Sequence, residues 1–251
     1  MRRSYFRNTP IRLLAALILL LVLAALVALD NHREARMDML DAIRDSAADT
    51  ADYTGRGRLS ERVMEAMAAV PRHEFVGEQM KPRAYLNTAL PITHGQTISQ
   101  PFIVALMTDF LDPQPDHVVL EVGTGSGYQA AVLSGLVRHI YSIEIIAGLT
   151  ESAGAVLSRL GYENVTLRTG DGYLGWPEHA PFDGIVVTAA ADNIPPPLVE
   201  QLKPGGNLII PVEASGGHQE LILVEKGENG TVSERSVLPV RFVPLTGDHQ
   251  D

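Results

Sequence analysis

The stretch from His117 to Tyr128 constrains the fold of this chain more than any other. It reads H-V-V-L-E-V-G-T-G-S-G-Y, and four of the six residues after His117 are apolar, which predicts a short buried strand. Three glycines follow at alternate positions, and Gln129–Val137 then has the apolar periodicity of a helix. Because glycine has no Cβ, such a turn is tight and lets a ligand approach the backbone beside the helix N-terminus.

Two classes of ligand use a turn of this kind, and the residue before it favours one of them. Dinucleotide-binding proteins carry G-x-G-x-x-G and hold a pyrophosphate at the helix N-terminus. Here the pattern is G-x-G-x-G, and Glu121 precedes it. A carboxylate in that place repels a pyrophosphate and suits a cationic group, such as the amino group of a methionine moiety. The motif resembles the first motif of class I S-adenosylmethionine-dependent methyltransferases, and a tight βα turn without a ligand is the alternative.

Strands and helices alternate from residue 117 to residue 212. This order predicts an α/β fold with a Rossmann-like, doubly wound, mostly parallel sheet that binds its ligand at the carboxyl ends of the strands. The predicted helices are Leu59–Val70, Phe102–Leu111, Leu149–Leu160 and Pro195–Leu202, and the further strands are Ile140–Ile143, Val165–Arg168, Phe182–Thr188, Leu208–Val212, Gln219–Glu225 and Ser236–Val243.

Two acidic residues stand at the ends of predicted strands. Glu144 lies 21 residues after Gly123, where a carboxylate typically accepts two hydrogen bonds from the ribose hydroxyls of a ligand. A surface acid near a helix is the alternative for Glu144. Asp171 lies between two glycines after the next strand, where it predicts an acceptor for an adenine amino group, although Gly-Asp-Gly is also an ordinary turn.

The charge of the chain is unevenly distributed. Its net charge is −10, and the first 29 residues contain four arginines and no acid, so they carry +4 and the remainder carries −14. An acidic body argues against nucleic acid as a partner, because phosphate binding needs a basic face. Solubility is the other explanation of this charge. The chain has no cysteine, which excludes disulfides, thiol catalysis and cysteine metal ligands, and we expect no metal site.

An unbroken apolar run of 17 residues, Leu13–Leu29, follows the basic N-terminus. This length is close to the minimum for a membrane-spanning helix. A cleaved signal peptide needs small residues at positions −3 and −1 of the cut, and Leu26 fits poorly for a cut after Ala28. The sequence therefore predicts an uncleaved single-pass anchor in residues 1–29, a polar stalk or linker in residues 30–57 that is helical to about Ala51, and a catalytic domain in residues 58–251.

Motifs outside the glycine turn are similar to those of one family. V-P-R-H-E-F-V, L-P-I-T-H-G-Q-T-I-S-Q-P, P-F-D-G-I-V-V-T-A-A-A and V-R-F-V-P-L-T occur in this order. Over about residues 58–247 the chain resembles protein-L-isoaspartate O-methyltransferases. The resemblance implies S-adenosylmethionine as cofactor and L-isoaspartyl residues of damaged proteins and peptides as substrates. It leaves the oligomeric state open.

The resemblance also implies functional residues. The local sequence alone favours Ser99 as an ordinary helix cap, two residues before Pro101. The resemblance, in contrast, places Ser99 at the position of the family's catalytic serine. Two departures from the family pattern, Thr93 and Glu213, replace glycines and predict an altered substrate preference. The cofactor-binding residues carried over are Thr97, Ser99, Glu121, Gly123, Gly125, Gly127, Glu144, Asp171, Gly172 and Thr246.

The family's reaction is an in-line displacement by a carboxylate that is already a nucleophile at neutral pH. Catalysis then needs orientation and exclusion of water rather than a strong base. His94 is a candidate base, but a loop histidine is more often solvated, so it is not assigned a role. Two alternatives remain. A methyltransferase acting on nitrogen usually carries an N-P-P-Y-type motif where this chain has T-A-A-A at residues 188–191. The other alternative is a membrane-anchored protein that binds the cofactor or damaged peptides without turnover.

The side of the membrane is predicted differently by two arguments. The flank before the apolar run is rich in arginine and the flank after it is mixed, so the positive-inside rule places the domain on the exported side. The family, in contrast, looks cytoplasmic, and S-adenosylmethionine is made in the cytoplasm. The sequence leaves this conflict open.

Overall fold

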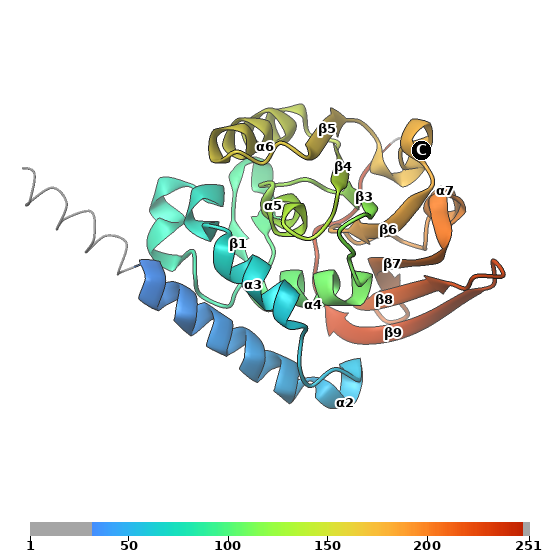
Figure 1. The fold of residues 1–251 in the computed structure, drawn as a ribbon, viewed down its shortest axis with the longest axis horizontal. Helices are drawn as coiled ribbons and strands as arrows, with labels where there is room; N and C mark the ends of the chain where they lie inside the picture. The colour runs from blue at the N-terminus through green and yellow to red at the C-terminus, as the bar shows by residue number, and fades with distance from the viewer. Residues whose placement is uncertain (1–31, 248–251) are drawn as a thin grey trace, which may run out of the picture.

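The computed structural model describes residues 32–247, and a mixed sheet of seven strands forms their centre (Figure 1). The strand order is β5-β4-β3-β6-β7-β8-β9, in which the first five strands are parallel and the last two are antiparallel to their neighbours. The predicted α/β, mostly parallel sheet is therefore confirmed. The strands are β3 Val118–Val122, β4 His139–Glu144, β5 Val165–Thr169, β6 Phe182–Val187, β7 Leu202–Ala214, β8 His218–Lys226 and β9 Val232–Val240, with a separate short pair, β1 Leu90–Pro91 and β2 Thr97–Ile98.

Successive side chains of a strand point to opposite faces of the sheet. Apolar strand side chains lie on both faces here, and helices cover both. On β3, Val119 belongs to the apolar core beneath α3 (Glu61–Ala69), α4 (Pro101–Leu111) and α5 (Tyr128–Ser134), whereas Leu120 and Val122 belong to the core beneath α7 (Pro196–Gln201). The α-helices are α2 Ala51–Thr54, α3 Glu61–Ala69, α4 Pro101–Leu111, α5 Tyr128–Ser134, α6 Ala147–Leu160 and α7 Pro196–Gln201, and the 3-10 helices are η1 Arg72–Phe75, η2 Glu78–Arg83, η3 Thr93–Gly95, η4 Gly172–Leu174 and η5 Pro177–His179.

Two strands differ in extent from the sequence prediction. β7 begins at Leu202 and runs through the two glycines at 205 and 206, because it pairs with β6 across a register shift. β9 begins at Val232, where its exposed side chains have no apolar pattern, because its backbone is held by pairing with β8. Strand length here follows from cross-strand hydrogen bonds, which apolar periodicity does not report.

The segment predicted as a polar stalk is helical over residues 32–49 and packs against the sheet domain. Met39, Leu40, Ile43 and Ala47 are buried and belong to the main apolar core. They recur at helical spacing, so one side of the helix is apolar even though the segment as a whole is polar. Within the described residues, this helix is a docked element and not an extended stalk. The division of the chain into domains at residue 57 stays a prediction.

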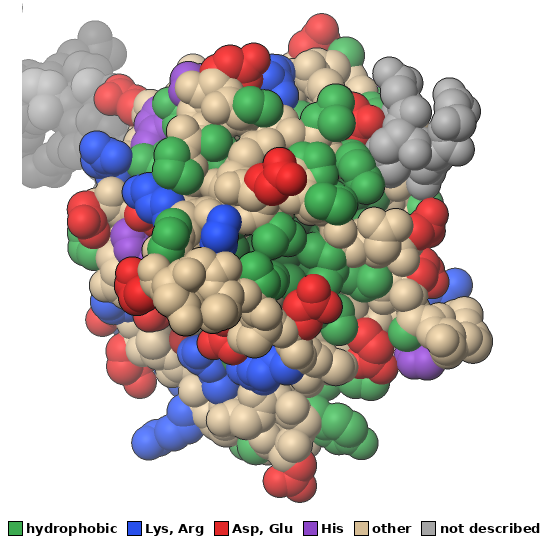
Figure 2. Space-filling view, turned by 90° about the vertical axis from the view of Figure 1, so that its right-hand side faces the viewer, with side chains coloured by type: hydrophobic (Ala, Val, Ile, Leu, Met, Phe, Trp, Pro, Cys, Tyr) green, Lys and Arg blue, Asp and Glu red, His purple; other side chains and the backbone are tan. Residues whose placement is uncertain are grey.

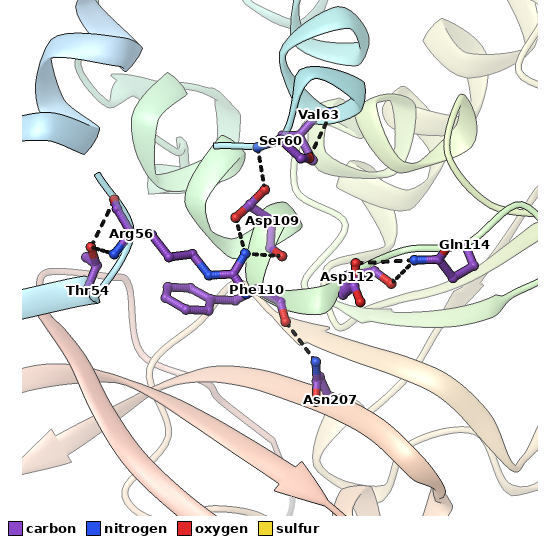
Figure 3. A network of polar contacts seen from close by, with 9 residues as sticks. All are labelled: Thr54, Arg56, Ser60, Val63, Asp109, Phe110, Asp112, Gln114 and Asn207. Atoms are coloured by element: carbon purple, nitrogen blue, oxygen red, sulfur yellow. Dashed lines mark hydrogen bonds and ion pairs between the residues drawn. The ribbon is translucent and has the colours of Figure 1, made fainter. Parts of the chain in front are cut away.

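An ion pair between the partly exposed Arg56 and the buried Asp109 holds the connection between α2 and α3 against α4 (Figure 3). Arg56 Nη1 donates to the carboxylate of Asp109, whose side chain is only 3% exposed, and to its carbonyl oxygen at 3.2 Å. The N–H of Ser60 donates to the same carboxylate at 2.8 Å, and the Arg56 guanidinium lies 4.5 Å from the Phe110 ring centroid. Both oxygens of the buried acid are therefore paired, as its burial requires.

The described surface carries the acidic character that the sequence predicts. Figure 2 shows Asp and Glu side chains spread over one face, around apolar side chains near its centre. Among residues 32–247 no helix is long and apolar enough to cross a membrane. The predicted anchor, Leu13–Leu29, lies outside the described residues.

Candidate active site

A cavity lies at the carboxyl ends of β3, β4 and β6. Its wall comes mainly from residues 96–99, 122–126, 143–146 and 243–246. The remaining lining residues are Val104, Tyr128, Gln129, Gly172, Thr188 and Ala189. Chain segments more than a hundred residues apart therefore meet at one edge of the sheet, where a doubly wound fold binds its ligand.

The glycine turn needs its glycines for different reasons. All three have positive φ, +94° at Gly123, +54° at Gly125 and +86° at Gly127, a region that other residues rarely adopt. A Cβ on Gly123 would lie 2.4 Å from the hydroxyl of Thr188, whereas one on Gly125 would meet nothing closer than 4.0 Å. Gly123 and Gly125 line the cavity. Gly127 does not: it packs against α6, where an added Cβ would lie 3.3 Å from Leu157.

Glu144 is placed where the sequence predicts a ribose-binding acid. Its Oε2 accepts the N–H of Gly125 at 2.8 Å, and its Oε1 accepts the N–H of Ile146 at 3.0 Å. The residue is only 6% exposed, yet it lines the cavity. Because each carboxylate oxygen accepts at two lone-pair sites, both oxygens keep capacity for hydroxyl donors from the cavity.

Glu121 lies beneath the glycine turn, fully buried and outside the cavity wall. Ser142 donates a hydrogen bond to Glu121 Oε2, and Ser142 Oγ lies 2.6 Å from the hydroxyl of Thr124 in the turn. Burial raises the pKa of Glu121 to about 8, against the lowering effect of the hydrogen bond from Ser142. Because its side chain is fully buried and does not line the cavity, Glu121 is not placed for the direct contact with a cationic ligand that the sequence suggested.

Ser99 is held at the cavity by its backbone. It lines the cavity together with Thr97, and its carbonyl accepts a hydrogen bond from Arg72 Nη2 at 2.7 Å. The Arg72 side chain is completely buried, also donates to the carbonyl of Ala84 at 2.8 Å, and places its guanidinium 4.6 Å from the ring centroid of Tyr128. Burial lowers the pKa of Arg72 from its usual value. Sequence reasoning missed Arg72, although it lies in the motif V-P-R-H-E-F-V.

Ser99 is not the helix cap that its local sequence allows. The N-cap residue of α4 is Gln100, and its side chain makes no capping hydrogen bond. Asn87 Oδ1 instead accepts the N–H of Phe102 at 3.0 Å, which satisfies one of the free donors at the helix start. The Ser99 side chain therefore has no capping role in this structure.

The remaining predicted cofactor residues divide between the wall and its support. Gly172 and Thr246 line the cavity, but Asp171 does not. Asp171 Oδ1 accepts the N–H of Tyr173 at 2.9 Å, so this acid caps η4 beside the wall. A Cβ on Gly172 would lie 2.3 Å from Val122, which explains why only glycine fits there. Thr188, which the sequence did not single out, also lines the cavity.

The two departures from the family pattern lie away from this wall. Thr93 is exposed in η3, and Glu213 is exposed on β7, where its Oε1 accepts from Gln219 at 2.7 Å. Their predicted effect on substrate preference stays a prediction.

His94, with φ +58°, places its ring against Gly148 of α6 and is exposed. Among residues 32–247 no group of three His, Cys, Asp or Glu side chains is placed to hold a metal ion.

The fold and this cavity together define a class I S-adenosylmethionine-dependent methyltransferase. The model of the protein-L-isoaspartate(D-aspartate) O-methyltransferase family matches residues 52–250, and the chain belongs to that family. It is 56% identical to protein-L-isoaspartate O-methyltransferase 1 of Cupriavidus necator over 94% of this chain and 92% of that protein. It is 58% identical to protein-L-isoaspartate O-methyltransferase 2 of Syntrophobacter fumaroxidans over 92% of this chain and 96% of that protein.

Solved structures show the same fold. A protein-L-isoaspartate O-methyltransferase superposes with a TM-score of 0.74 at 28% identity, covering 85% of this chain and 66% of that one. A putative protein-L-isoaspartate O-methyltransferase from Plasmodium falciparum, solved in complex with S-adenosyl-L-homocysteine, superposes with a TM-score of 0.71 at 24% identity, covering 86% of this chain and 99% of that one. The recognition of the family from its sequence motifs is thereby confirmed.

Proposed function

We propose that this protein transfers a methyl group from S-adenosylmethionine to the α-carboxylate of L-isoaspartyl residues in damaged proteins. Family membership and the identity to its relatives support this activity. The observation that carries it is the meeting of the segment Thr97–Ser99 (β2 and the residue after it) with the glycine turn and Glu144 in one cavity. The following backbone amide nitrogen then attacks the ester carbonyl without further catalysis and expels methanol, which gives a succinimide. Hydrolysis of the succinimide returns part of it to normal aspartate.

The cavity fits S-adenosylmethionine. We assign the ribose hydroxyls to Glu144, whose oxygens are oriented by backbone N–H groups of the turn and of α6. Gly123 and Gly125 bring bare backbone to the wall. When bound, the cofactor supplies an electrophilic methyl group on a sulfonium and leaves as the thioether. Thr97, Ser99, Gly172 and Thr246 complete the assigned wall, and Glu121, Gly127 and Asp171 support it from behind.

The substrate carboxylate needs orientation more than activation. It is ionised at neutral pH, so no strong base is required. We assign to the Ser99 hydroxyl a hydrogen bond that holds this carboxylate in line with the methyl group. Arg72 supports this assignment, because it fixes the backbone of Ser99 from the buried side. Burial of the cofactor between loop and turn excludes water from the reacting atoms.

Methyl transfer to synthetic peptides tests the proposal. The full-length protein is expected to methylate an isoaspartyl peptide and to leave the matched normal aspartyl peptide unmodified. Ser99→Ala removes one positioned hydrogen bond, worth about 1–3 kcal/mol, so its rate should fall about tenfold to a hundredfold. Ser158→Ala, an exposed serine on α6, is the matched control. Equal methylation of both peptides would contradict the substrate assignment, and normal turnover by Ser99→Ala would contradict the role of the serine.

We also propose that residues 13–29 form a single-pass membrane anchor. The uncharged apolar run and the arginines before it support this, and the charge difference across the run favours an exported domain. Cofactor supply and the family favour a cytoplasmic domain. Protease treatment of intact spheroplasts, followed by detection of the catalytic domain, distinguishes an exported domain from a cytoplasmic one. Digestion from outside would establish export, protection until lysis would refute it, and a soluble protein with an intact N-terminus would refute the anchor.

A further inference from the structure

A second hollow opens beside the cofactor cavity and shares part of its wall. Thr97, Ser99, Thr188 and Val243 line both. The second hollow then extends along the segment that follows β9 and along Phe102 at the start of α4. We call this second hollow the peptide groove, a reading that rests on the proposed function. If Ser99 orients the carboxylate of an isoaspartyl residue, the substrate polypeptide on either side of the isoaspartyl residue lies in this groove.

One wall of the peptide groove comes from the N-terminal helix. Ser46 and Asp49 of helix 32–49, and Thr50 at its end, line the groove. These residues precede the region 52–250 that the family model matches. The helix therefore adds side chains to the peptide groove, and these side chains lie outside the region that the family model matches.

The helix is fixed relative to the start of α4, which follows Ser99 in the chain, so these side chains have defined positions. Asn87 donates through Nδ2 to Ser46 Oγ at 2.9 Å and to the carbonyl of Ala42 at 3.3 Å. The same side chain accepts the N–H of Phe102, three residues after Ser99, at 3.0 Å. One amide thus joins the helix to the start of α4, and the buried apolar face of the helix holds it in place.

Two of the three ionisable side chains along the groove have no ion-pair partner among residues 32–247. Asp49 and Arg241 both line it and are exposed, and neither makes an ion pair or side-chain hydrogen bond with another residue in the range 32–247. His218 is the third ionisable group of the wall, and its Nε2 atom lies 3.4 Å from Oε1 of Glu220. Asp49 stands on the helical wall and Arg241 on the segment after β9, so the groove offers a negative and a positive contact on different elements.

We infer that Asp49 is a specificity-determining residue that selects substrates with a lysine or arginine beside the isoaspartyl residue. A basic side chain in the groove can pair with the Asp49 carboxylate, which has no other partner within the described part of the chain. The contact is exposed, so it is expected to change substrate preference about twofold to fivefold and to weaken with salt. Helix 32–49 is then a substrate-reading element as well as a structural one.

Steady-state methylation of a peptide set tests this inference. The peptides share one isoaspartyl residue and carry Lys, Ala or Glu on its N-terminal or its C-terminal side. The readout is the ratio of kcat/KM between Lys and Glu peptides for the full-length protein. We expect a ratio of about two to five on one side, a ratio near one for Asp49→Asn, and an inverted ratio for Asp49→Lys. Asp45→Asn, one turn earlier on the same helix, exposed and outside the groove, should keep the wild-type ratio.

The outcomes separate this inference from the proposed function. Methylation of the isoaspartyl peptides with the same ratio in wild type and in both Asp49 variants would overturn the inference and leave the proposed function standing. Absence of methylation from every isoaspartyl peptide would overturn the proposed function, and the inference with it. A ratio that changes equally in Asp45→Asn would also overturn it, because the effect would then be one of general charge.

Discussion

Replacing Glu121 by glutamine is expected to change how the stability of the protein depends on pH. The side chain is fully buried, and its Oε1 atom has no hydrogen-bond partner among residues 32–247. Burial raises the pKa of this carboxyl to about 8 in the folded protein, whereas its ordinary value is 4.5. Glutamine has nearly the same shape and no charge, so it removes the titration and keeps the packing.

The sign follows from where the proton is held. Between pH 4.5 and about 8 the folded protein keeps a proton on Glu121 that the unfolded chain has released. Because the folded-state pKa is raised, the contribution to stability is complete at low pH and is lost as pH rises through about 8. At about 1.4 kcal/mol for each pH unit, this interval corresponds to about 5 kcal/mol in the free energy of unfolding.

Urea unfolding between about pH 5 and pH 9 measures the effect. Relative to Glu121→Gln, the wild-type protein should lose about 4 kcal/mol of stability over this range, nearly all of the interval calculated above. Glu151→Gln, which removes an exposed acid on α6, serves as the control and should follow the wild type. Parallel stability profiles for wild type and Glu121→Gln would refute the reasoning, because they would mean that Glu121 is ionised in the folded protein.

Three further outcomes are expected. Asp109→Asn weakens the charged hydrogen bonds to Arg56, whose side chain is 37% exposed and so stays solvated, and it should reduce the free energy of unfolding by about 1–2 kcal/mol in urea titrations, whereas Asp112→Asn, at an exposed position nearby, should change it little. Glu144→Ala should weaken S-adenosylmethionine binding about tenfold or more by calorimetry, and unchanged affinity would remove its ribose assignment. Arg72→Lys keeps the charge but loses the paired donors, so kcat should fall about tenfold with a smaller change in KM, and a loss confined to KM would contradict its positioning role.

Part of the site could be predicted from sequence because the residues that form it are contiguous. The strand, the positive-φ glycines and the acid at the end of β4 all lie within short stretches, and the structure places Gly123, Gly125 and Glu144 on the cavity wall. Glu121 was predicted from its charge beside the turn, but alternation along β3 directs its side chain into the buried layer below. Proximity in sequence did not decide which face a side chain takes.

The sequence by itself determined the βα order, the turn at the carboxyl end of β3 and the family, because each depends on residues that are neighbours in the chain. Only the tertiary structure decided that helix 32–49 docks beside the catalytic loop and that Arg72 holds Ser99. Arg72 and Ser99 are 27 positions apart, and Asn87 bonds to Ser46 across 41 positions. Such contacts depend on which surfaces meet when the apolar faces of distant elements are buried together, and local periodicity carries no information about that pairing.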